Sequence, residues 1–195
     1  MRTVFFDIDS QLDFLYPSGA LYVPAAERVV PAIASLNRHA AAHGMPVVST
    51  VDAHAEDDPE FKTWPPHCVA GAIGQHKAEA TLLDRRVIIP NRPSEIALEG
   101  TQQIVVEKQT VDVFKAINLG RIVELLSPDR CVVYGVVTEI CVLFAARGLL
   151  QLGKRVVIVT DAVQTLKGAD AVRALGELQS AGAVLTEARA ILAGG

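Results

Sequence analysis

Short runs of apolar, mostly β-branched residues recur along the chain, and each run is nearly continuous instead of alternating with polar residues. They cover residues 3–8, 46–51, 86–89, 103–106, 131–135 and 154–160. Continuous apolar runs of this length are typical of strands that are buried on both faces of a sheet. The hydrophobic pattern therefore predicts six interior strands.

Segments with apolar residues at helical spacing lie between several of these runs. They cover residues 25–43, 117–126, 139–152 and 169–180, and glycines suited to ending a helix follow three of them. Strands that alternate with helices form βαβ units. We therefore expect one α/β domain over residues 1–195, with three αβα layers, a mostly parallel six-stranded sheet and helices on both faces.

Composition and charge exclude several classes of protein. Half of the 195 residues are hydrophobic, and the net charge of −4 contains no block of like charge, so no nucleic-acid or membrane-surface partner is indicated. The first apolar run is too short for a signal peptide, and no apolar stretch is long enough to span a membrane. We expect a cytoplasmic protein whose three cysteines are thiols.

Polar residues cluster where the predicted strands end, which is where parallel sheets carry their active sites. The clusters follow four of the predicted strands: Asp7 and Asp9; Asp52 and His54; Glu107 and Lys108; and Thr138 to Cys141.

Cys141 follows the fifth strand in a turn that leads into a predicted helix. Thr138 can act as the N-cap, which would put Cys141 in the first helical turn, where free N–H groups and the helix dipole stabilise a thiolate. The same N–H groups could bind an oxyanion. The alternative is a small buried hydrophobic residue, and that alternative suits Cys131, which lies inside an apolar strand.

A cysteine that cleaves amides needs a partner to accept and return its proton. Asp9 can serve as this base, and the ammonium of Lys108 can hold the carboxylate and favour the thiolate. In the alternative interpretation Asp7, Asp9 and Asp13 are turn or cap residues, and Lys108 pairs with its neighbour Glu107 or faces water.

A third group of residues has the composition of a metal site. Asp52 and His54 are two residues apart in an extended segment, so both can face one ion. Glu60 follows, and His67 comes directly after two prolines that stiffen its backbone. This mixed nitrogen and oxygen set suits zinc, iron or manganese better than calcium. The alternative is that the spacing is accidental.

In this order the motifs resemble those of the isochorismatase-like cysteine hydrolases, and within them those of the nicotinamidases. The matching segments are residues 9–14 (DSQLDF), Lys108, residues 135–142 (GVVTEICV), residues 52–54 (DAH) and residues 64–68 (WPPHC). The resemblance implies a Rossmann-like fold and hydrolysis of a small amide, most specifically nicotinamide to nicotinate and ammonia. It also implies a homo-oligomer.

The resemblance also implies roles for individual residues. Cys141 would form a thioester, Asp9 would move the proton, and Lys108 would balance the charge. A cis peptide between Val136 and Val137 would aim the N–H groups of Val137 and Cys141 at the oxyanion.

The resemblance further implies how the substrate and the metal are bound. One divalent transition metal would be held by Asp52, His54 and His67, with Glu60 as a further candidate ligand. Phe14 and Trp64 would flank the substrate ring, and Ile140, which stands where relatives usually have an aromatic residue or histidine, would give the pocket an aliphatic wall.

Three alternatives remain. The chain could hydrolyse another small amide or an isochorismatase-type substrate. Residues 6–12 also come close to the motif of the haloacid-dehalogenase phosphatases, in which Asp7 would be the nucleophile and Asp9 the acid, with magnesium. A non-catalytic binding protein with the same fold is the third alternative.

Overall fold

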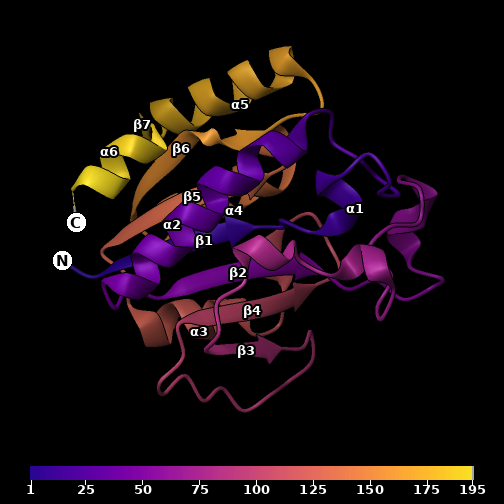
Figure 1. Ribbon diagram of the computed structural model, residues 1–195, viewed down its shortest axis with the longest axis horizontal. Coiled ribbons are helices and arrows are strands. Elements are labelled where there is room, and N and C mark those ends of the chain that lie inside the picture. Colours follow the sequence, from indigo (N-terminus) through magenta and orange to yellow (C-terminus); the bar gives the residue numbers. More distant parts are fainter. Residues whose placement is uncertain (195) are drawn as a thin grey trace.

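The computed structural model describes residues 1–194, in which seven parallel strands form one sheet in the order β3-β4-β2-β1-β5-β6-β7 (Figure 1). The central strands β1 and β2 are buried along their whole length, as their continuous apolar pattern predicts. The strands are β1 (Thr3–Ile8), β2 (Val47–Asp52), β3 (Arg86–Ile89), β4 (Gln103–Lys108), β5 (Arg130–Val136), β6 (Arg155–Gln164) and β7 (Val184–Thr186).

Helices cover both faces of the sheet. Two of them, α2 (Val30–Ala42) and α6 (Ala188–Ala193), pack together on one face; α2 lies in front of β1 in Figure 1, and α6 packs on β6. The other face carries α3 (Leu119–Leu126), α4 (Leu143–Gln151) and α5 (Gly168–Ser180), and α4 packs on β5 and β6. The short helix α1 (Leu12–Leu15) follows β1. In residues 1–194 no helix is both long and apolar enough to cross a membrane.

The predicted α/β fold is confirmed, but the strand count of six was too low. The missed strand, β7, has only three residues and is partly exposed at the sheet edge, so it has no buried apolar run to reveal it. The predicted helix over residues 139–152 is also divided: Thr138–Val142 form a π-helical turn, and α4 begins only at Leu143.

Gly135 allows strand β5 to lie close against β1. Its φ is +116°, and a Cβ atom at this position would lie 2.1 Å from the carbonyl oxygen of Ile8. Only glycine fits this backbone and this spacing. The close approach brings the segment after β5 next to the segment after β1.

Candidate active site

Four side chains from four strand ends meet at the carboxyl edge of the sheet. Asp9 follows β1, Asp52 ends β2, Lys108 ends β4 and Cys141 follows β5. β1 pairs with β2 and β5, β2 pairs with β4, and the register sets Asp52 directly opposite Lys108. The parallel sheet therefore gathers residues that are far apart in sequence, at the point beside β1 where the chain changes direction across the sheet.

The ammonium of Lys108 lies at the centre of this group. Its Nζ is 2.9 Å from Asp9 Oδ2, 2.5 Å from Asp52 Oδ1 and 3.9 Å from Cys141 Sγ. Asp9 Oδ1 accepts a hydrogen bond of 2.6 Å from the Thr50 hydroxyl. All of these side chains are buried, so the interactions act in a low-dielectric environment.

The backbone at Asp9 contributes to this arrangement. Asp9 has φ of 48°, in the left-handed region that residues other than glycine seldom adopt. Its N–H donates to the Thr50 carbonyl oxygen at 3.1 Å, which stabilises the conformation. Strained backbone of this kind is concentrated at functional sites.

Burial and charge determine the protonation of the group. Burial by itself would lower the pKa of Lys108, but Asp52 and Asp9 outweigh it and hold that pKa well above its usual value. Burial raises the pKa of the Cys141 thiol; Lys108 opposes this effect, whereas Asp9 and Asp52 add to it. Burial thus favours the neutral thiol at Cys141, whereas Lys108 favours the thiolate.

The turn that carries Cys141 also differs from the predicted one. Thr138 is not an N-cap, because its hydroxyl donates to the Gln164 carbonyl oxygen at 2.8 Å. The peptide bond between Val136 and Val137 is cis. The oxyanion role of Val137 and Cys141 stays a prediction.

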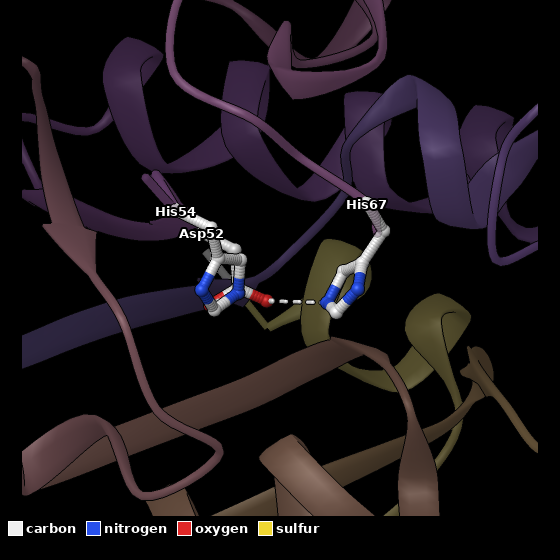
Figure 2. Close-up of side chains that lie close together, drawn as sticks. All are labelled: Asp52, His54 and His67. Atoms are coloured by element: carbon white, nitrogen blue, oxygen red, sulfur yellow. Dashed lines mark ion pairs between the residues drawn. The ribbon is translucent and has the colours of Figure 1, made fainter. Parts of the chain in front are cut away.

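Asp52, His54 and His67 face one another beside the Lys108 group (Figure 2). Their potential ligand atoms lie within 4.8 Å of one another, and each of the three residues is buried. Hydrogen bonds from His54 N–H to the Cys68 carbonyl oxygen (3.1 Å) and from Ala70 N–H to the His54 carbonyl oxygen (2.9 Å) hold the two histidine-bearing segments together.

The two imidazoles each have a ring nitrogen that is available to bind a cation. His67 Nδ1 lies 2.8 Å from the Pro65 carbonyl oxygen, so it carries the proton and leaves Nε2 free. Burial lowers the pKa of His67, which favours the neutral ligand form. His54 Nε2 is buried without a hydrogen-bond partner, 3.9 Å from Asp52 Oδ1. A buried nitrogen lone pair facing a carboxylate fits a bound metal ion.

Two residues that support this group escaped the sequence analysis. Asp58 Oδ2 lies 3.0 Å from His54 Nδ1, although not in line for a good hydrogen bond, and such a carboxylate fixes the tautomer of a metal-binding histidine. Gln11 brackets the backbone of Asp52: its Nε2 donates to the Asp52 carbonyl oxygen at 2.8 Å, and its Oε1 accepts from the Asp52 N–H at 2.7 Å.

Glu60, the fourth candidate ligand, does not belong to the close group of Asp52, His54 and His67. It lines a pocket to which Asp52 and His67 also contribute. Burial raises the pKa of its carboxyl group, and the charge of Asp52 raises it further. A direct bond from Glu60 to the metal therefore remains a prediction.

The pocket beside Cys141 has an empty volume of about 390 Å³, part of it open to solvent. The three predicted substrate-binding residues, Phe14, Trp64 and Ile140, all contribute to its walls. Among the described residues, its polar lining consists of Asp52, Glu60, His67 and Cys141, and its other walls are apolar.

Asp7 belongs to a separate buried network and does not line this pocket. Its Oδ2 accepts from Lys77 Nζ at 2.9 Å and from Asn37 Nδ2 at 2.8 Å, and its Oδ1 accepts from the Ser10 hydroxyl at 2.7 Å. A carboxylate satisfied in this way is a structural ion-pair partner, which leaves no nucleophile for a phosphatase. Asp13 is a structural residue as well: it accepts from the Cys68 N–H at 2.7 Å and so anchors the loop that carries His67.

The other two cysteines are buried free thiols. Burial raises the pKa of Cys131 to about 12 and that of Cys68 still further, and neither of these two thiols lines the pocket beside Cys141.

The fold and the site together define an α/β protein with a pocket at its strand ends, where a thiol, carboxylates and a buried ammonium lie beside a potential metal site. The model of the isochorismatase domain matches residues 3–190, and the chain belongs to this family of hydrolases. No curated protein sequence matches the chain.

Solved structures of several amidases share the fold. A nicotinamidase from Bacillus subtilis is 26% identical with a TM-score of 0.83, covering 96% of this chain and 100% of that chain. A pyrazinamidase of Pyrococcus horikoshii in complex with zinc is 26% identical with a TM-score of 0.80, covering 96% of this chain and 99% of that chain. An N-carbamoylsarcosine amidase from Thermoplasma acidophilum is 25% identical with a TM-score of 0.77, covering 96% and 97%.

Proposed function

We propose that this protein is a metal-dependent cysteine amidohydrolase that converts nicotinamide to nicotinate and ammonia. The observation that carries the proposal is the buried group of Asp9, Lys108 and Cys141. Cys141 lines the pocket, and the group lies directly beside the potential metal ligands Asp52, His54 and His67. Nicotinamidase and pyrazinamidase neighbours that cover nearly the whole chain support the same activity.

In the first half of the reaction Asp9 accepts the thiol proton, and Cys141 Sγ attacks the amide carbonyl carbon. The N–H groups of Val137 and Cys141 stabilise the oxyanion that forms. When the C–N bond breaks, Asp9 returns the proton to the leaving nitrogen, which departs as ammonia and leaves a thioester on Cys141.

In the second half Asp9 takes a proton from water, and the resulting hydroxide attacks the thioester. The carboxylic acid leaves, and the proton returns to Cys141 Sγ. Throughout the cycle Lys108 remains an ammonium because it is held between two carboxylates, so it neutralises the charge that Asp9 alternately gains and loses.

The pocket suits a neutral ring amide. None of the described residues that line it is a lysine or an arginine, so its lining offers no cationic side chain to bind a substrate carboxylate. Phe14 and Trp64 offer aromatic surface to a ring, and Ile140 offers an aliphatic wall. A divalent metal held by Asp52, His54 and His67 would act as a Lewis acid that binds a ring nitrogen and orients the substrate.

Ammonia release from a panel of amides tests the proposal. The panel contains nicotinamide, pyrazinamide, the carbamoylated amine N-carbamoylsarcosine and maleamate. Each amide is tested with protein that has been supplied with zinc, iron or manganese. We expect nicotinamide to have the highest kcat/KM and the two carboxylate-bearing compounds, N-carbamoylsarcosine and maleamate, the lowest. Preference for either of these acids would replace nicotinamide as the substrate, and no ammonia from any amide would disprove the proposed activity.

Metal content is expected to depend on the two histidines. The wild-type protein should bind about one transition metal ion per chain, and His54→Ala or His67→Ala should lose it, because each removes a ligand from a three-residue set. Asp58→Asn should weaken metal affinity by about 10- to 100-fold through its effect on His54. Elemental analysis of protein purified without chelator measures all three variants.

His76→Ala is the matched control for the metal experiment. His76 is exposed and is not one of the three grouped residues, so its replacement should leave the metal content unchanged. Full metal content in both His54→Ala and His67→Ala would refute this assignment.

A further inference from the structure

A thin partition separates the substrate pocket from a second hollow on its outer side. Trp64, Ile140 and Leu166 line both spaces, and we call these three side chains the partition. The outer hollow has an empty volume of about 770 Å³, and charged side chains, including Lys167 and Arg173, contribute to its walls. The partition therefore decides whether a substrate is confined to the inner pocket or can extend outward.

Leu166 lies in the segment between β6 and α5, and Glu139 holds that segment in place. Glu139 Oε1 accepts hydrogen bonds of 3.0 Å from the N–H groups of Leu166 and Lys167. Its Oε2 accepts a hydrogen bond of 2.7 Å from the Thr165 hydroxyl. One carboxylate thus fixes three consecutive residues, and bonds of N–H and O–H donors to an ionised acceptor are stronger than neutral ones.

Glu139 itself has no access to the reaction. It lies two residues before Cys141, but it lines only the outer hollow and not the substrate pocket. Its effect on a substrate must therefore act through the position of Leu166.

We propose that Glu139 is a positioning residue that sets the size limit of the substrate pocket by holding Leu166 in the partition. The inference rests on the proposed amidase function, since it concerns the substrate of the same pocket. Without the Glu139 carboxylate, Leu166 is free to move, the inner pocket opens towards the outer hollow, and amides with an added group fit.

Substrate selectivity tests this inference. The probes are the best amide substrate of the panel and its analogues with a methyl group or a fused benzene ring. In Glu139→Ala and in Leu166→Ala, the kcat/KM for the bulkier analogues relative to that for the small amide should each rise by on the order of ten-fold. A difference of one methylene group in an apolar pocket has an effect of this size. Most of the shift should lie in KM.

The double variant and the conservative variant identify the route of the effect. Because Glu139 acts through Leu166, Glu139→Ala should add little to the ratio in the Leu166→Ala background. Glu139→Gln keeps an oxygen for the two N–H groups and should restore the wild-type ratio. Equal loss of activity towards small and bulky amides in Glu139→Ala, or additive effects in the double variant, would overturn the inference.

Glu187→Ala is the matched control, because Glu187 is a surface carboxylate whose ion pair with Arg189 lies away from both spaces. Backbone hydrogen exchange supplies a readout that needs no substrate. The amides of residues 165–167 should exchange faster in Glu139→Ala than in the wild-type protein, and at the wild-type rate in Glu187→Ala. Unchanged exchange in Glu139→Ala would overturn the inference. Wild-type protein that hydrolyses no amide would instead refute the proposed activity.

Discussion

Replacing Cys141 with alanine is expected to reduce ammonia release by at least about 10⁴-fold, the scale of loss when a covalent nucleophile is removed. Among the described residues that line the pocket, the other polar side chains are Asp52, Glu60 and His67, which belong to or adjoin the potential metal site and are not thiols. The loss should appear in kcat, and the variant should still fold, because alanine fills a buried position without adding polar groups.

Cys131→Ala is the control for this experiment. Cys131 is as buried as Cys141 but lies within β5, away from the pocket, so its loss should affect stability and leave kcat nearly unchanged. Mass spectrometry of the wild-type protein quenched during turnover should detect the acyl group on Cys141. Wild-type turnover in Cys141→Ala would refute the nucleophile assignment.

The residues that the sequence predicted well are those whose position follows from the sheet. Asp9, Lys108 and Cys141 each come at the end of a continuous apolar run, and the carboxyl ends of parallel strands meet at one edge. Runs of buried residues are visible in sequence, so the convergence of these three side chains was predictable although 132 residues separate the first from the last.

The residues that the sequence did not reveal are positioned by contacts across loops. Asp58 and Gln11 act on His54 and Asp52 through such contacts. Gln11 stands in the motif of residues 9–14, but the motif does not reveal this contact, and Asp58 belongs to none of the quoted motifs. For Thr138 the sequence predicted a role that the structure does not show. Threonine is suited to be an N-cap, but the Thr138 hydroxyl donates its hydrogen bond to the carbonyl oxygen of Gln164, 26 residues further along the chain. Local propensity was overridden by a tertiary contact.

The pKa of Cys141 likewise depends on residues outside its local turn. The helix-dipole argument considers only the local turn, whereas the thiol is buried beside two carboxylates that come from other strands. Because burial favours the neutral thiol, the proposed reaction needs a base that accepts the thiol proton, which is the role expected of Asp9.

Asp9→Asn is the variant that tests this proton transfer. Asparagine keeps the shape of the side chain and its bond from Thr50, and Lys108 keeps its ion pair with Asp52, so the fold should persist. The amide cannot accept the thiol proton, and kcat should fall by about 10²- to 10⁴-fold. Steady-state kinetics with the best amide substrate measures the loss.

Asp7→Asn separates this role from general damage to a buried carboxylate. Asp7 lies in β1 two residues earlier and is paired with Lys77, so its replacement should lower stability while kcat stays within about ten-fold of the wild-type value. Loss of amide hydrolysis in Asp7→Asn with full activity in Asp9→Asn would refute the assignment of Asp9 as the base.

The pH dependence of alkylation at Cys141 tests whether Asp9 is a base or only a charge that changes the pKa of the Cys141 thiol. The pKa of Cys141 is raised first by burial, and the negative charge of Asp9 raises it further, so Asp9→Asn should lower it. Iodoacetamide should therefore react with Cys141 at lower pH in Asp9→Asn than in the wild-type protein. If Asp9 only adjusted the thiol, this easier ionisation would increase turnover. Because Asp9 must also return the proton to the leaving nitrogen, turnover should fall while alkylation becomes easier.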